Sequence, residues 1–194
     1  MLIQIAVNGT HPNSCISRHI FFKIFDHLVL PQQVDEYKDC FKDNVKFIVL
    51  ERDPRDVYVS NKYMWSKKKK PFFPTTPEEF SDIWRRTVHS PRNSDKVLVV
   101  HFEDLIYNYN SEVKRIEDFL GLNSESHNLP KKFFDNSISI DNTQLFRVSP
   151  QWGEDMPYLE EHLADYLYSF PYERIANQND VLSFRHMKTD SSKK

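Results

Sequence analysis

The feature that most restricts the fold is a mainly apolar, β-branched run at residues 45–51, VKFIVLE, which ends directly before Arg52. Apolar and β-branched residues without alternation are typical of a strand that is buried on both faces. A second run of this kind follows at residues 96–101, KVLVVH, and helical patterns lie between and after the two runs. This alternation predicts an α/β fold, a parallel sheet flanked by helices. We expect one such domain over residues 1–176 and a polar tail over residues 177–194.

Local signals place the other elements. Asp53 is a suitable N-cap for a helix after the first run, Pro54 suits its first position, and we expect this helix to reach Trp65. Further helices are expected at residues 32–43, at 77–88, at 111–120 with Ser111 as cap and Gly121 as end, and at 155–170. A strand is expected at residues 2–7, a helix leading into a strand at 16–30, and irregular structure at 130–150.

Composition excludes several classes of protein. The net charge of −2 gives no overall electrostatic reason for a nucleic-acid partner. Cys15 and Cys40 are the only cysteines, so a disulfide framework is not expected and a reducing, cytoplasmic setting is. No apolar run approaches the roughly 18 residues that span a bilayer. The histidines show no metal-binding spacing, and no metal is expected.

Phosphate binding by a glycine-rich loop is also unexpected. The only glycines are Gly9, Gly121 and Gly153. A GxxxxGK(S/T) loop needs clustered glycines, so that several backbone N–H groups can point at one anion. The chain has no such cluster, which argues against a relative of the nucleoside-phosphate kinases.

A different phosphate site is indicated where the first strand ends. Arg52 stands at the carboxyl end of that strand, the edge at which open α/β sheets bind ligands. Ser60 follows eight residues later, about two helical turns along. The planar guanidinium matches phosphate oxygens, and the hydroxyl adds a short neutral donor. The pair therefore predicts a site for one phosphate group.

The same residues carry a resemblance. The run RDPRDVYVS from Arg52 to Ser60 is similar to the 3′-phosphate-binding motif of sulfotransferases that use 3′-phosphoadenosine 5′-phosphosulfate (PAPS). The run HFEDL at residues 101–105 and the helix SEVKRIEDFLGL resemble the family's following strand end and helix. The resemblance covers residues 45–172. It implies a sulfotransferase-like fold, related to P-loop NTPases, in which Arg52 and Ser60 bind the 3′-phosphate and Phe102 stacks on adenine.

Plainer interpretations stand beside these roles. Arg52 and Asp56 alone could form a surface ion pair, Phe102 could be a core residue, and Arg55 is expected to be a solvated helix residue. Arg147, near Trp152 in FRVSPQW, loosely resembles the family's late basic residue, which helps to hold the 3′-phosphate. The lysines of residues 67–70 either steer anions or are simply solvated.

The chain departs from the family near its beginning. Sulfotransferases have a phosphosulfate loop that carries a basic residue, and the only candidate here, residues 6–15, has none. The N-terminal part is therefore expected to be atypical or truncated. For catalysis, the resemblance suggests His27 as the base, with Asp26 behind it and Lys23 as a cation, although His27 is equally well read as an ordinary histidine.

Two functions follow from the sequence. The first is transfer of a sulfuryl group from PAPS to a hydroxyl or amine acceptor, a glycan in our reading, with Arg52, Ser60, Phe102 and Arg147 binding the nucleotide. The second is a catalytically impaired module that binds PAPS or its desulfo product, 3′-phosphoadenosine 5′-phosphate (PAP), without chemistry. The sequence predicts no nucleic-acid partner and no membrane segment, and it leaves the oligomeric state open.

Overall fold

The computed structural model describes residues 2–9, 18–24, 45–65, 73–87, 93–123, 132, 134–148 and 150–174. Its contacts divide the chain into two compact units, each built from two separate stretches. The sheet unit comprises Met1–Arg52 and Ile83–Asn136, and the helical unit comprises Asp53–Asp82 and Ser137–Lys194. The two units are described separately below. The single domain expected over residues 1–176 stays a prediction.

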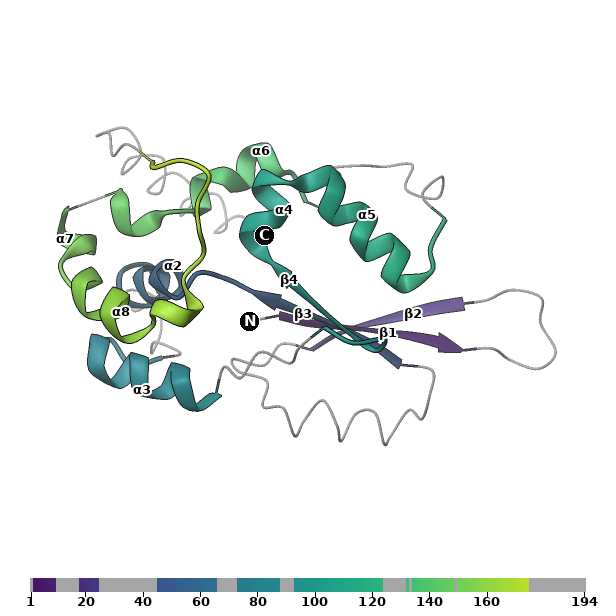
Figure 1. The fold of residues 1–194 in the computed structure, drawn as a ribbon, viewed down its shortest axis with the longest axis horizontal. Helices are drawn as coiled ribbons and strands as arrows, with labels where there is room; N and C mark the ends of the chain where they lie inside the picture. The colour runs from purple at the N-terminus through teal and green to yellow at the C-terminus, as the bar shows by residue number, and fades with distance from the viewer. Residues whose placement is uncertain are drawn as a thin grey trace, which may run out of the picture. The chain divides into compact units, whose positions relative to one another are not determined.

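The sheet unit contains four strands in the order β2-β1-β3-β4 (Figure 1). They are β1 (Leu2–Gly9), β2 (Arg18–Ile24), β3 (Val45–Glu51) and β4 (Val97–His101). The strands expected at residues 2–7, 45–51 and 96–101 are confirmed. Residues 18–24, expected to lie in a helix that leads into a strand, form strand β2 instead.

The predicted parallel pairing holds for β3 and β4, where Phe47 lies opposite Val97 and Glu51 opposite His101. The remaining pairing is a correction, because β1 runs antiparallel to both β2 and β3. Strand β2 follows β1 in the chain after a short connection, and neighbouring strands joined in this way run antiparallel. Apolar periodicity shows that a segment is a strand but carries no information about its direction.

The interior of the sheet unit forms on β3 and β4. Phe47 and Val49 are fully buried, while Ile48 and Leu50 on the opposite face of β3 are half-buried. The strand expected to be buried on both faces is therefore completely buried on one. Strand β4 leads directly into helix α4 (Phe102–Tyr107), which the sequence analysis missed because its apolar pattern covers only six residues.

Helix α5 (Tyr109–Leu120) follows α4 and confirms the helix predicted at residues 111–120, with two further residues at its start. Ser111 is not its cap, because the Ser111 hydroxyl donates to the Asn108 carbonyl at 2.9 Å and Asn108 holds the N-cap position. Gly121 ends the helix as predicted, with a positive φ of 69° that favours glycine.

The helical unit begins with α2 (Pro54–Val59), and the chain continues as a π-helix, η2 (Ser60–Trp65), so the helix expected to reach Trp65 does so with a change of winding. The other elements are α3 (Pro77–Thr87, continuing into the sheet unit), α6 (Asn136–Ser139, beginning at the last residue of the sheet unit), η4 (Ile140–Asn142), η5 (Leu145–Arg147), α7 (Pro150–Gly153), α8 (Met156–His162) and η6 (Ala164–Tyr166). The core of this unit includes Tyr58, Val59, Phe80, Leu145, Leu159 and Leu163, all almost fully buried.

Two expectations about this unit are corrected, and a third expectation concerns residues that the structure does not describe. The helix predicted over residues 155–170 ends at His162, since the chain turns at Leu163 and is extended by Leu167. The region 130–150, expected to be irregular, contains the short helices α6, η4 and η5. The helix expected at residues 32–43 lies outside the described residues. Within the described ranges, no helix has the length and apolar character needed to cross a membrane.

Candidate functional site

The segment from Arg52 to Ser60 has the architecture that its sequence predicts. Arg52 follows the carboxyl end of β3, and Asp53 then caps α2, its carboxylate accepting the Arg55 N–H at 2.9 Å. Ser60 is the C-cap of α2 and the first residue of the π-helix η2. Stretches of π-helix are rare and occur frequently at functional sites. Strand, cap and helix thus position the two predicted phosphate ligands at the ends of α2.

Phe102 lies next to Arg52 in the sheet unit. The Arg52 guanidinium carbon is 5.1 Å from the centre of the Phe102 ring, a cation–π contact. Phe134 meets the same ring edge-on, with 6.3 Å between centroids. The structure therefore brings together two of the predicted nucleotide ligands. The stacking of adenine on Phe102 stays a prediction, and one face of the ring already carries the guanidinium.

Arg55 is a correction, since the sequence suggested a solvated residue and the structure buries it to 7% exposure. Its guanidinium donates to both carboxylate oxygens of Asp53, at 3.0 and 2.8 Å, and to Glu160 Oε1 at 2.8 Å. It also lies 4.3 Å from the centre of the Phe146 ring. Burial alone would lower the pKa of Arg55, but the hydrogen bond and charge of Asp53, with those of Glu160, raise it. Arg55 therefore acts as a charged core residue.

Asp56 is likewise no partner in a surface ion pair, because it is fully buried. Its two oxygens accept the backbone N–H groups of Gln144 at 2.8 Å and of Leu145 at 2.6 Å. These partners lie 88 and 89 residues along the chain, so the sequence alone did not reveal them. The only available signal was an acidic residue in the first turn of a helix.

Arg147 is the last residue of η5. Its Nη2 donates to Glu173 Oε1 at 3.0 Å, and its guanidinium carbon lies 5.4 Å from the centre of the Phe146 ring. Its Nε is buried and has no hydrogen-bond partner among the described residues. A buried N–H without an acceptor is costly, so this nitrogen is suited to an anionic ligand.

The predicted catalytic residues are described less fully. Lys23 lies in β2, where its backbone is paired with Gln4 of β1. Asp26 and His27 lie outside the described residues, as do residues 10–15 of the candidate phosphosulfate loop and the lysines of residues 67–70. Their roles therefore stay predictions.

Comparison with known proteins decides the family. The family model described as "Sulfotransferase domain" matches residues 25–150, a span that includes Arg52, Ser60, Phe102 and Arg147. The chain belongs to the sulfotransferase family. It is 34% identical to Sulfotransferase 2A2 and 33% identical to Sulfotransferase 2A6, both of Rattus norvegicus, over 105 residues. Each match covers 47% of this chain and 37% of the relative's length. The α/β fold and the resemblance drawn from the motifs are thereby confirmed.

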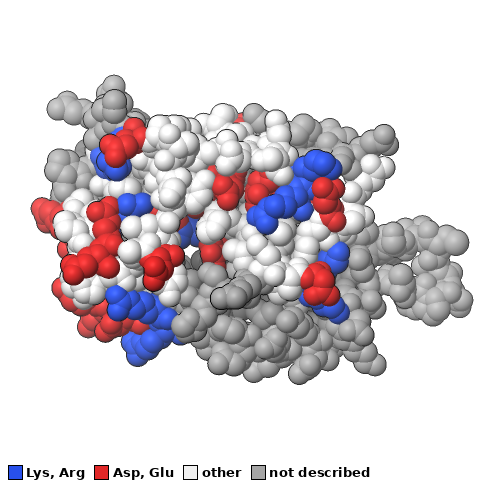
Figure 2. Space-filling view, viewed as in Figure 1, with Lys and Arg blue, Asp and Glu red and all other residues white. Residues whose placement is uncertain are grey.

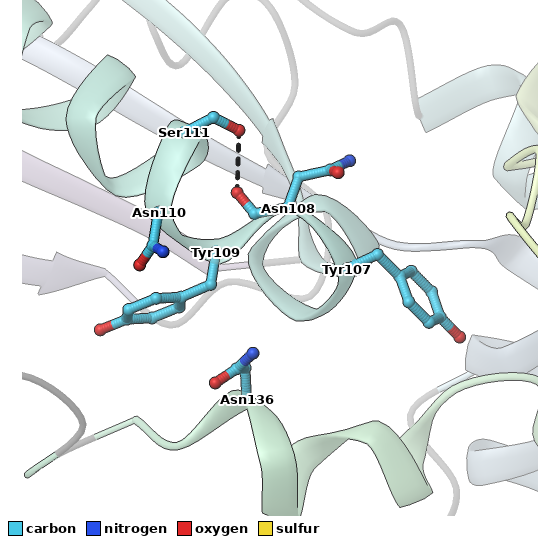
Figure 3. A pocket seen from close by; sticks show the side chains of 6 residues that line it. All are labelled: Tyr107, Asn108, Tyr109, Asn110, Ser111 and Asn136. Atoms are coloured by element: carbon cyan, nitrogen blue, oxygen red, sulfur yellow. Dashed lines mark hydrogen bonds between the residues drawn. The ribbon is translucent and has the colours of Figure 1, made fainter.

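The sheet unit also has a polar hollow of about 430 Å³. It is lined by Tyr107, Asn108, Tyr109, Asn110, Ser111 and Asn136. The Tyr109 phenol and the Asn136 carboxamide face each other across it (Figure 3). All six side chains are neutral and able to hydrogen-bond, and carboxamides offer both donors and acceptors. Such a lining suits an uncharged, hydroxyl-bearing molecule better than an anion.

Charge is mixed on the face drawn in Figure 2, where acidic side chains gather on the left and basic ones are interspersed. Helix α8 contributes the exposed acidic residues Glu160 and Glu161. The drawn face therefore shows no broad basic surface among the described residues that would attract an anion as a whole. Among the described residues, no group of histidine, cysteine and carboxylate side chains could hold a metal ion. The expectation of a metal-free protein stays a prediction.

A partly buried polar network connects α2, η2 and the segment before α8. The Tyr58 hydroxyl lies 2.7 Å from Asp155 Oδ2 and 2.8 Å from the Thr75 carbonyl oxygen. Lys62 Nζ donates to the Tyr58 hydroxyl at 3.1 Å and also contacts Asp155 Oδ2. Burial, followed by the hydrogen bond to Asp155, raises the pKa of Tyr58. Burial opposes the charge of Lys62, but Asp155 outweighs it and raises the pKa of Lys62.

These shifts predict a loss of stability at alkaline pH. Both groups hold their protons more tightly when folded, so their contribution is complete below their unfolded pKa values of about 10 and is lost as pH rises above them. We expect the free energy of unfolding, measured with urea at a series of pH values, to fall above about pH 10. Tyr58→Phe should make this fall shallower, whereas Tyr172→Phe, at a half-exposed tyrosine, should not. Equal pH dependence in Tyr58→Phe and the wild type would contradict this assignment.

Proposed function

We propose that this sulfotransferase uses PAPS and transfers its sulfuryl group to a hydroxyl or amine of a glycan. In the reaction, the acceptor oxygen or nitrogen forms a bond to sulfur, the bond between sulfur and the bridging phosphate oxygen breaks, and PAP leaves. One observation supports the proposal most directly: β3 leads straight into α2 within the matched sulfotransferase domain. Arg52 follows the last residue of β3, and Ser60 caps the C-terminal end of α2.

The residues present fit the nucleotide that the family implies. We assign the 3′-phosphate to Arg52, Ser60 and Arg147, because a guanidinium and a hydroxyl donate to phosphate oxygens and Arg147 Nε is buried without an acceptor among the described residues. Phe102 is assigned to the adenine. Since Arg52 lies over one face of this ring, the base would stack on the other face or displace the guanidinium.

In this proposal, residues in the N-terminal part of the chain carry out the proton transfer. His27 is assigned as the base that accepts the acceptor's proton, with Asp26 orienting the imidazole and Lys23 supplying positive charge. Bound PAPS supplies the activated sulfuryl group. An imidazole suits the role of base because its ordinary pKa of about 6.5 lies near neutral pH.

The acceptor class is proposed from the polar hollow of the sheet unit. Three carboxamides, two phenols and a hydroxyl line it, and none of its side chains is charged. Vicinal sugar hydroxyls need donors and acceptors at short spacing, which asparagine side chains provide. This lining supports a glycan acceptor. The cytoplasmic setting, proposed from the scarcity of cysteine, is a separate inference.

A binding module without catalysis is the second candidate, and the β1–β2 pair favours it. Residues 6–9, where the candidate phosphosulfate loop begins, lie in β1, which pairs antiparallel with β2. A strand that leads into a phosphosulfate loop and then a helix would not pair in this way with the segment that follows it. In this second candidate, PAP or PAPS binds through Arg52 and Ser60, but nothing holds the 5′-phosphosulfate.

Transfer of labelled sulfate from PAPS to a panel of glycans and simple alcohols tests the proposal. We expect labelled glycan in the presence of the chain, and its loss in His27→Ala, with PAP binding measured by calorimetry in both proteins. Binding of PAP without transfer by the wild type would rule out the enzyme and support the binding module. Absence of both would rule out both functions.

A further inference from the structure

Asp56 links the two elements of the helical unit that carry proposed phosphate ligands. Its buried carboxylate lies in the first turn of α2, which ends at Ser60, and it accepts the N–H groups of Gln144 and Leu145. Gln144 is the N-cap of η5 and Leu145 is its first residue, and η5 ends at Arg147. The Asp56 carboxylate therefore connects α2, which ends at Ser60, to η5, which ends at Arg147, across 88 residues of sequence.

The carboxylate acts as the missing cap of η5. Gln144 holds the N-cap position, but its side chain makes no capping hydrogen bond. The first N–H groups of a helix have no partner within the helix, and a negative charge is favourable at that end. Asp56 supplies both an acceptor for each of two N–H groups and the charge.

The turn that Asp56 holds has an unusual conformation. Gln144 has φ 53° and ψ 40°, and it is the only non-glycine residue with positive φ in the described part of the chain. Its carboxamide donates to the Tyr172 carbonyl and accepts the Arg174 N–H, each at 2.9 Å. The Arg147 N–H in turn donates to the Gln144 carbonyl at 3.0 Å. The backbone of Arg147 is thus set directly by this turn.

We propose that Asp56 is a positioning residue that fixes the direction of Arg147 toward the 3′-phosphate. The inference rests on the proposed function, because it assumes that Arg147 contacts that phosphate. Left-handed non-glycine residues persist where the surrounding structure over-determines them, often at ligand sites. Here Asp56, Tyr172 and Arg174 hold Gln144, and the held turn carries Arg147, whose buried Nε has no acceptor among the described residues.

Two nucleotides separate positioning from mere stability. PAP carries the 3′-phosphate and 5′-AMP lacks it, so the ratio of their affinities, measured by calorimetry, reports the contact to that group alone. Arg147→Ala should lower this ratio by roughly tenfold or more. Asp56→Asn keeps the shape but replaces one acceptor with a donor, and it should lower the ratio several-fold while changing 5′-AMP affinity less than twofold. The double variant should lose no more than Arg147→Ala alone.

Leu163→Val is the matched control, because it loosens the core of the same unit at a residue outside α2 and η5, and it should leave the ratio unchanged. If Asp56→Asn does not fold, Gln144→Gly tests the same turn and should lower the ratio in the same sense. An unchanged ratio in Asp56→Asn, or in Arg147→Ala, overturns the positioning role while PAP binding by the wild type upholds the site. Failure of the wild type to bind PAP overturns the proposed site and the positioning role together.

Discussion

Replacing Arg52 with alanine is expected to weaken PAP binding by about 1.5–3 kcal/mol, roughly 10- to 150-fold in affinity. The reason is the loss of charge-assisted hydrogen bonds to the 3′-phosphate, which a methyl side chain does not replace. The PAP affinity of Arg52→Lys should lie between those of the wild type and Arg52→Ala, since lysine keeps the charge but lacks the planar guanidinium. Calorimetric titration with PAP measures all three proteins.

Arg86→Ala is the control, because Arg86 is an exposed arginine of α3, and it should bind PAP within about twofold of the wild type, the small effect typical of an exposed charge. The fold must also be monitored, since Arg52 lies over the Phe102 ring. A cation–π contact of this kind contributes about 0.5–1 kcal/mol, so the free energy of unfolding should change little. PAP affinity that is the same in Arg52→Ala and the wild type would refute the proposed site.

The largest effect on stability is expected from Asp53→Ala, at about 3 kcal/mol or more in the free energy of unfolding. Asp53 is 1% exposed and accepts four hydrogen bonds, three from Arg55 and one from the Tyr168 N–H at 3.0 Å. Its removal leaves the Arg55 guanidinium buried with a single partially exposed carboxylate, Glu160, and removes the cap of α2. Urea unfolding measures the change.

Two further variants test this explanation. Asp118→Ala removes an exposed carboxylate paired with Lys114 on α5, and it should cost less than about 0.5 kcal/mol. Arg55→Met added to Asp53→Ala should recover part of the loss, because an apolar side chain needs no buried partner. If the double variant is as unstable as the sum of the two single ones, the buried charge is not the cause.

Local patterns in the sequence predicted the segment that matters most. The apolar run of β3, the cap at Asp53 and Pro54 at the first position of α2 are all encoded by neighbouring residues, and each was found where expected. Gly121 at the end of α5 belongs to the same class. Hydrogen bonds over two to five residues and the burial of a short apolar run depend on adjacent side chains, so a single sequence reveals them.

The family also followed from sequence, through the residues from Arg52 to Ser60 and the run at residues 101–105. The sequence predicted the positions of the individual site residues less completely than it predicted the family. The contact of Arg52 with Phe102 agrees with the motif pair, while the roles of Lys23, Asp26 and His27 are still predictions.

Only the tertiary structure decided the direction of β1, the end of α8 at His162 and the burial of the charged side chains of Arg55 and Asp56. Arg55 and Asp56 have the composition of a solvated helix surface, yet both are buried, because Glu160, Gln144 and Leu145 arrive from about 90 to 105 residues away. Charged side chains enter a core only when other groups satisfy their hydrogen bonds, and here Asp53 meets part of that need for Arg55 while distant groups meet the rest. The packing of the whole unit determines which distant residues become these hydrogen-bond partners, so a local sequence pattern does not predict them.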